Sequence, residues 1–232
     1  MPDKPPLDSL DTRHARRRIL SRIRAAQGRP DQAKDREEEL NYNYIAQRPV
    51  GPQPDAGTDL VGRFVEQSER LQSTVALVRS LKEVPNAVAE YLRGRGLGNR
   101  AVIWKSFDRL NWKSAGLEVA VRAPTRDDPE PDMVGITGCF AAIAETGTLA
   151  MLSGPDSPAA LTLLPETHIA VVPSSRIVAH MEDVFALIRH ERGGVPRALN
   201  FISGPSRTAD IEQTLVLGAH GPYRVHLIII KE

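Results

Sequence analysis

The chain has 232 residues, of which 41% are apolar and 25% charged, with a formal net charge of +1. This composition is typical of a soluble globular protein and excludes an intrinsically disordered chain, and no apolar run approaches the ~20 residues that a membrane-spanning helix needs. The single cysteine, Cys139, excludes an internal disulfide and an iron–sulfur cluster held by this chain alone, because such a cluster needs about four thiolates. We therefore expect the reducing cytoplasm, and the basic N-terminus lacks the apolar core of a secretory signal.

The first thirty residues form a basic arm. They carry eight basic residues against three acidic ones, a net charge of +5, which leaves −4 on the remainder. Such an arm can bind nucleic acid or an acidic protein. Because it lacks interleaved aromatic residues and the remainder offers no compensating basic surface, we expect docking on protein and no nucleic-acid binding.

The N-terminal quarter is expected to be an extension of the main domain. Residues 8–27 predict a helix with a narrow apolar stripe that includes Ile19 and Ile23. Residues 30–57 are rich in proline, glycine and charge, which indicates a linker or an extended strap. The predicted domains are therefore 1–57, the basic helix and strap, and 58–232, a compact domain.

The compact domain alternates between predicted helices and strands. Such alternation predicts an α/β fold with a mainly parallel sheet covered on both faces. The expected helices are 59–81, 86–93, 158–164 and 180–191, with a helical turn around 108–112. The expected strands are 100–104, 117–122, 133–139, 148–152, 168–172, 198–202 and 225–230.

The segment from Ser203 to Pro222 resembles a ligand-binding turn. Gly204 and Pro205 end an apolar run, and residues 206–210 are expected to begin a helix. The free N–H groups of a helix N-terminus, with Arg207 beside them, suit a carboxylate or phosphate. The candidate ligand-binding residues in this segment are Gly204, Ser206, Arg207, Thr208, Asp210, His220 and Gly221. Equally, Ser206 or Thr208 caps a helix and His220 is a hydrogen-bonded turn residue.

The central segment FAAIAETG offers a candidate catalytic carboxylate, Glu145. It is surrounded by small and apolar residues, and Thr146, Gly147 and Thr148 beside it are candidate ligand contacts. Poor solvation would raise the pKa of its carboxyl unless a cation or backbone N–H groups stabilised the charge. Glu145 could act as a base, a nucleophile or a ligand anchor, or be a buried acid paired with an arginine.

The remaining reactive side chains predict no further site. The histidines have no spacing typical of a zinc site, so no metal is expected. His226 is expected in a strand with its ring hydrogen-bonded, His168 to make a core hydrogen bond, and His180 to lie on the surface. Cys139 is expected to be an inert core thiol. No P-loop, Rossmann fingerprint or G-x-S-x-G motif is present.

Several motifs, in this order and spacing, resemble the LUD domain family of lactate utilization protein C. They are GITGCFAAIAETGTLAM (135–151), LLPETHIAVVP (163–173), GPSRTADIE (204–212) and GAHGP (218–222), and the resemblance covers about residues 58–230. It implies an α/β fold of the ribose-5-phosphate isomerase/CoA-transferase-like superfamily.

The same resemblance implies a subunit that supports oxidation of L-lactate to pyruvate. It places the iron–sulfur clusters and flavin-linked chemistry in partner proteins, with no cofactor held by this chain. This chain would bind a small anionic ligand or steady its partners, and homo-oligomerisation stays open. The alternative is a stand-alone CoA-transferase-like or isomerase-like enzyme that uses Glu145 on a phosphorylated or CoA-linked substrate.

Overall fold

The computed structural model describes residues 13–28, 33–47, 51–124, 133–208, 216–218 and 220–231. The chain divides into two units, Met1–Pro52 and Gln53–Glu232. The sequence-based boundary between residues 57 and 58 stays a prediction. No helix in the described ranges combines the length and the apolar character needed to cross a bilayer.

The N-terminal unit contains two helices, α1 (Arg13–Ala26) and α2 (Ala33–Gln47). Helix α1 agrees with the described part of the predicted helix, and Ile19 and Ile23 are exposed on it, by 58% and 46%. The expectation of an extended strap is wrong for residues 33–47. This stretch contains no proline or glycine and is rich in Ala, Lys, Arg, Glu and Leu, which favour helix.

The main sheet of the larger unit has six strands, all parallel, in the order β1-β12-β7-β4-β2-β3. It confirms the predicted mainly parallel sheet. Strand β12 lies between β1 and β7, and Thr74 is paired with His226 in the first of these ladders. The strands are β1 (Thr74–Val78), β2 (Arg100–Ile103), β3 (Glu118–Ala120), β4 (Val134–Thr137), β7 (Thr167–Pro173) and β12 (Arg224–Ile230).

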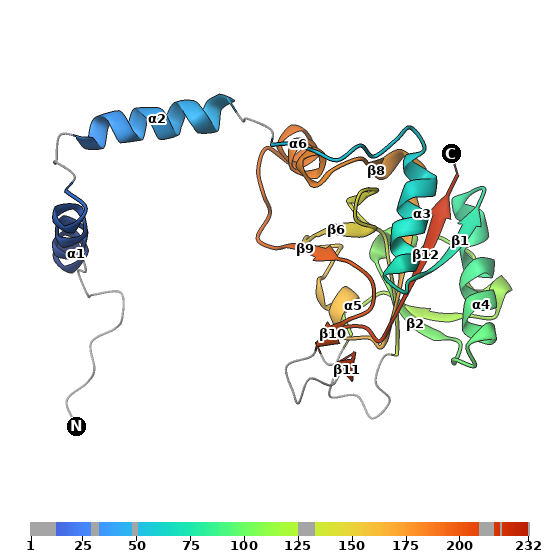
Figure 1. Ribbon diagram of the computed structural model, residues 1–232. Helices are drawn as coiled ribbons and strands as arrows, with labels where there is room; N and C mark the ends of the chain where they lie inside the picture. The colour runs from blue at the N-terminus through green and yellow to red at the C-terminus, as the bar shows by residue number, and fades with distance from the viewer. Residues whose placement is uncertain are drawn as a thin grey trace, which may run out of the picture. The chain divides into compact units, whose positions relative to one another are not determined.

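Helices α3 (Leu60–Arg70) and α4 (Val84–Gly94) cover opposite faces of this sheet, as Figure 1 shows around β1 and β12. Successive strand residues point to opposite faces. Ile228 and Ile230 accordingly join the core under α4, whereas Leu227 and Ile229 pack with Phe64 of α3. Burial on both faces explains the continuous apolar run at the end of the sequence.

A second sheet, which the sequence did not predict as such, has the order β8-β5-β6-β9. Strands β5 (Ala141–Ile143) and β6 (Thr148–Leu152) form an antiparallel hairpin, flanked by β8 (Ile177–Val178) and β9 (Leu199–Ile202). One face packs under α6 (Met181–Arg192), and the other joins the core under α3. The remaining helix is α5 (Ala160–Leu163).

Two element predictions for the first half of this unit need correction. The helix expected over 59–81 ends at Arg70, and its second half is strand β1. Gln72 has a φ of 67°, which reverses the chain between the two elements. A single helical turn is expected around residues 108–112. The structure has two short 3-10 helices instead, one before this stretch and one after it: η3 (Lys105–Phe107) and η4 (Lys113–Ala115).

Candidate functional site

The main sheet has a topological switch between β2 and β4. Strand β2 leads to β3 on one side, whereas the chain after β4 continues to β7 on the other side. In open α/β sheets, ligands bind beyond the carboxyl ends of the strands at such a switch. The first place to look for a site is therefore the edge that carries Trp104, after β2, and Gly138, after β4.

An inner cavity of about 520 Å³ lies at this edge. It is lined where five of the six strands end: by Arg79 after β1, Trp104 after β2, Gly138 after β4, Pro173 in β7 and Ile230 in β12. No hydrogen bond or ion pair ties the Arg79 guanidinium to the part of the chain that the structure describes, and only its backbone N–H is engaged, by Glu83 at 3.1 Å. The cavity thus combines an apolar floor with one cation that has no counter-ion within the described ranges.

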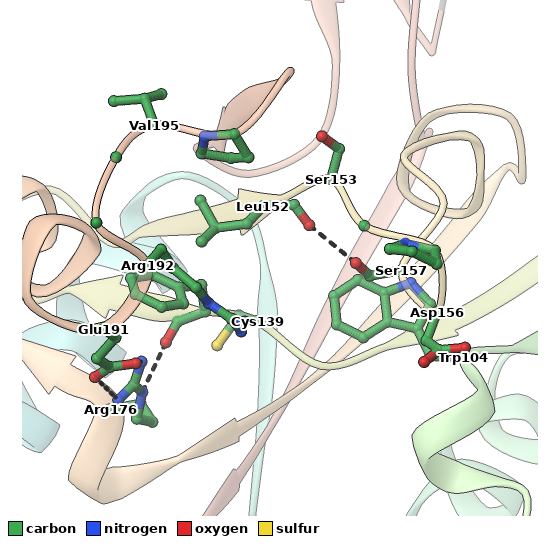
Figure 2. Close-up of a pocket in the computed structure, with 16 residues that line it drawn as sticks. Trp104, Cys139, Leu152, Ser153, Asp156, Ser157, Arg176, Glu191, Arg192 and Val195 are labelled. Carbon is green, nitrogen blue, oxygen red and sulfur yellow. Dashed lines mark hydrogen bonds and ion pairs between the residues drawn. The ribbon is translucent and has the colours of Figure 1, made fainter.

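An outer cavity of about 880 Å³ (Figure 2) shares two lining residues with the inner one. On one side Arg176 donates two hydrogen bonds to the Glu191 carboxylate, at 2.7 and 3.1 Å, and a third at 2.7 Å to the carbonyl of Phe140. The hydrogen bond from Arg176 lowers the pKa of the Glu191 carboxyl. The Arg176 guanidinium also lies 4.7 Å from the centre of the Phe140 ring. These contacts hold the Arg176 side chain in position where it lines the outer cavity.

Trp104 and Cys139 line both cavities. The indole Nε1 of Trp104 is buried and has no acceptor in the described part of the chain, whereas the indole of Trp112 donates to the Phe107 carbonyl at 2.9 Å. Burial raises the pKa of the Cys139 thiol to about 12. A thiol that stays protonated at neutral pH is a poor nucleophile, which supports its interpretation as an inert residue.

Glu145 lies elsewhere, in the turn between β5 and β6. Its Oε2 lies 3.0 Å from Nδ1 of His180, and the two side chains are 29% and 13% exposed. The expectation that His180 lies on the surface is therefore wrong: it caps α6, and its backbone N–H donates to Asp183 at 2.9 Å. Neither residue lines the inner or the outer cavity. A catalytic role for Glu145 stays a prediction.

The neighbours of Glu145 make close internal contacts. Thr146 donates to Thr148 at 2.8 Å, and the Thr148 hydroxyl lies 2.7 Å from that of Ser203. Gly147 has a φ of 64°, and a Cβ there would lie 2.5 Å from the backbone nitrogen of Ser68 in α3. These contacts hold the hairpin turn against α3.

The helix expected to begin at Ser206 is absent from residues 206–208. Strand β10 (Arg207–Thr208) pairs there antiparallel with β11 (Val216–Leu217). The Ser206 N–H donates to the Pro222 carbonyl at 2.9 Å, so it is not free to bind an anion. Since a strand has no helix dipole, the physical argument for an anion site at Ser206–Thr208 is lost.

Two further residues of this segment also make structural contacts. Arg207 donates to the Leu71 carbonyl at 2.8 Å. Gly204 packs against the same residue, and a Cβ there would lie 2.5 Å from the Leu71 carbonyl oxygen. Asp210 lies outside the described residues. Whether any of these side chains binds a ligand stays a prediction.

His220 and Gly221 line a third cavity of about 570 Å³, beside Arg224 at the start of β12. Arg224 lies 3.7 Å from the Glu166 carboxylate, just before β7 begins. This is the amino end of the parallel strands, the edge opposite to the inner and outer cavities. The candidate residues that the structure describes therefore lie in separate places, and none of these lines the carboxyl-edge cavities.

Sequence reasoning missed Arg79, Trp104, Arg176 and Arg192, which line the carboxyl-edge cavities. A search for polar or aromatic residues at the end of each predicted strand would have found Trp104, the last residue of the strand expected over 100–104. Two buried histidines behave as expected from the sequence: His168 Nε2 lies 2.7 Å from the Thr137 hydroxyl, and His226 Nδ1 lies 2.8 Å from the Thr74 hydroxyl. The described residues contain no group of three or more His, Cys, Asp or Glu side chains placed to hold a metal ion.

Comparison with known proteins gives matches in sequence and in structure. The lactate utilization protein C of Geobacillus kaustophilus is 41% identical over 109 residues, which cover 46% of this chain and 45% of that protein. The protein of the same name from Bacillus subtilis is 41% identical over 102 residues, 43% of this chain and 42% of that protein. These matches therefore span less than half the length of those relatives.

A solved structure supports the fold. The crystal structure of a DUF162 family protein from Deinococcus radiodurans is similar with a TM-score of 0.52 and 27% sequence identity. The match covers 78% of this chain and all of that one. Among protein families, the LUD domain matches residues 61–230, which include every strand of both sheets. The chain therefore belongs to the LUD domain family.

Proposed function

We propose that this chain is a lactate utilization protein C-like subunit that supports oxidation of L-lactate to pyruvate. The observation that carries the proposal is the identity of about 40% to proteins named lactate utilization protein C, within a LUD domain match over residues 61–230. The redox chemistry belongs to partner proteins with iron–sulfur clusters and flavin. This chain contributes a binding site for a small anionic ligand and a surface for those partners.

The carboxyl-edge cavities support the ligand-binding part of the proposal. Arg79 and Arg192 line them, and neither side chain makes a hydrogen bond or an ion pair within the described ranges. A guanidinium without a counter-ion attracts carboxylate or phosphate, which it can hold through two parallel hydrogen bonds. These two arginines support an anion site at this edge of the sheet.

The test is lactate-dependent reduction of a dye by the iron–sulfur partner proteins, with and without this chain. We expect the rate to rise with added chain until it saturates at a fixed ratio to the partners. The variant Arg189→Ala, changed on the exposed side of α6, is the control and should support the same rate of dye reduction as the unchanged chain. A rate that is indifferent to the chain at every ratio would refute the proposal.

A second candidate is the stand-alone enzyme that uses Glu145. The observation that favours it is the 3.0 Å contact between Glu145 and His180, since a carboxylate beside an imidazole is a common acid–base arrangement. Turnover of CoA esters or sugar phosphates by the isolated chain, lost in Glu145→Gln, would support this candidate. No turnover with either substrate class would exclude it.

A further inference from the structure

The two carboxyl-edge cavities are neighbours. They share Trp104 and Cys139 as lining residues, and their volumes are about 520 and 880 Å³. Pockets of roughly 300–1,000 Å³ each accommodate a drug-sized organic molecule. A three-carbon acid such as lactate would fill only a small part of this space. The region therefore has the size for a larger ligand.

The inner cavity has mainly apolar walls. Leu81, Phe107, Val171 and Ile230 contribute aliphatic and aromatic surface, and the Trp104 indole lines this cavity as well as the outer one. Such walls suit a planar or apolar group. Arg79 adds a cation that can lie over the face of an aromatic ring or contact its heteroatoms.

The outer cavity is also lined by an exposed arginine, Arg192. The two carboxylates that line it are already engaged: Glu191 with Arg176, and Asp156 with Lys105 at 3.5 Å. Arg192 itself makes no hydrogen bond or ion pair within the described ranges. A doubly charged phosphate next to this guanidinium would gain charge-assisted hydrogen bonds.

The neighbouring backbone leaves room for such a group. Gly193 and Gly194 follow Arg192 and line the same cavity, and a Cβ at either position would meet no atom within 4 Å. The phosphate can therefore approach Arg192 without displacing a side chain from these two positions.

The Trp104 indole lines both cavities with other atoms of its ring, since its Nε1 is buried. An aromatic group of a ligand can pack against this ring.

We propose that the two cavities form a single site for an aromatic organic phosphate of mononucleotide size. Its ring occupies the inner cavity beside the Trp104 indole, and its phosphate contacts Arg192 in the outer cavity. This inference rests on the proposed function for an anionic ligand and adds the class of that ligand.

The first test compares ligands that differ only in the phosphate. Isothermal titration calorimetry on the full chain would use AMP with adenosine and FMN with riboflavin, with L-lactate and inorganic phosphate as further probes. We expect at least one mononucleotide to bind about tenfold or more tightly than its nucleoside. The nucleoside lacks the phosphate and therefore the charged hydrogen bonds to Arg192. If neither mononucleotide binds, or lactate binds as tightly as both, the proposal is wrong.

Variants locate the phosphate. Arg192→Ala should reduce the affinity for the mononucleotide to that of the nucleoside and leave the nucleoside's affinity unchanged. Arg189→Ala, one turn earlier on α6 and outside the cavities, is the matched control and should change neither. An Arg192→Ala variant that weakens nucleotide and nucleoside equally, or neither, would overturn the placement.

Tryptophan fluorescence locates the ring. The chain has two tryptophans, and Trp112 already donates its N–H to Phe107. Binding should change the emission of Trp104, and Trp104→Phe should abolish that change. An emission that the ligand leaves unchanged at saturation would contradict the placement of its ring beside Trp104. If no mononucleotide binds but dye reduction by the partners still depends on the chain, the ligand class is rejected and the proposed function stands.

Discussion

The carboxylate of Glu145 contacts the imidazole of His180 across 35 residues of sequence, with Oε2 3.0 Å from Nδ1. This contact joins the β5–β6 turn to the N-terminus of α6. It gives Glu145 a partner that is a histidine, whereas the sequence suggested an arginine.

We expect Glu145→Gln to keep the accessory role intact. The amide can still hydrogen-bond to His180, so the loss of stability should be on the order of 0.5–1.5 kcal/mol. Lactate-dependent dye reduction by the partners should persist in the presence of the variant. Dye reduction that disappears while the unfolding midpoint is retained would show that Glu145 takes part in the chemistry.

Gly147→Ala should destabilise the larger unit by roughly 1–3 kcal/mol or more. The new Cβ would lie 2.5 Å from the Ser68 nitrogen, and a φ of 64° strains any residue with a side chain. Gly98→Ala is the matched control, since its Cβ would meet nothing within 4 Å and its φ is not positive. Thermal unfolding of the two variants checks the prediction, and equal midpoints would contradict it.

Stability should fall as the pH drops from about 6.5 to about 4. Burial lowers the pKa of His168 and of His226 to about 4 in the folded protein, against 6.5 for an unperturbed histidine. In this window the unfolded chain binds more protons than the folded one, so unfolding becomes more favourable with acidification. The full effect is on the order of 3 kcal/mol for each histidine.

Urea unfolding at several pH values measures this change. His190→Gln, at an exposed position, is the control and should leave the pH dependence unchanged. His168→Gln should reduce the slope between pH 6.5 and 4. A free energy of unfolding that stays constant across this window would disagree with the burial of both rings.

Arg176→Ala should cost more stability than Lys105→Ala. Arg176 is about 28% exposed and makes three hydrogen bonds, two to Glu191 and one to the Phe140 carbonyl. The Lys105–Asp156 pair is 69% exposed on both sides, and such surface pairs contribute about 0–1 kcal/mol. Chemical unfolding of the two variants provides the comparison, and similar losses would show that the Arg176 contacts contribute little.

Partner retention should depend on the apolar stripe of α1. Ile19 and Ile23 are exposed by 58% and 46% on a helix that carries no acidic residue in its first turn. Deleting residues 1–30, or replacing both isoleucines by serine, should abolish retention of the iron–sulfur partners in a pull-down. Replacing Ser21 by alanine is the control. Full retention by the deletion variant would remove the arm from the interface.

The sequence predicted the strands of the main sheet better than it predicted the site. The run from Val225 to Ile230 is apolar except for His226 because both faces are buried, and this pattern is typical of a central strand. By contrast, Leu71, Val75 and Val78 recur at helical spacing, which led to a single long helix where α3 is followed by β1. Ala141–Ile143 escaped notice because alanine has little strand propensity and the strand is short.

The site residues could not be found from local patterns. Arg79, Trp104 and Arg192 come from three separate segments, and only the strand order brings the first two to one edge of the sheet. Glu145 and Ser206 attracted attention because their immediate neighbours are glycine, serine and threonine. In the structure, these small residues serve close backbone contacts with α3 and Leu71.

The position of β12 has a consequence for how the protein folds. Its partner β1 lies 152 residues away in the sequence, as measured from Thr74 to His226, and no other strand of the described sheet pairs with β1. Closing so long a loop costs entropy before any of these contacts form, which slows folding. Until β12 arrives, both β1 and β7 present unpaired edges, and such edges promote aggregation. Recombinant production should therefore be sensitive to temperature and to chaperone supply, and truncation before β12 should give insoluble protein.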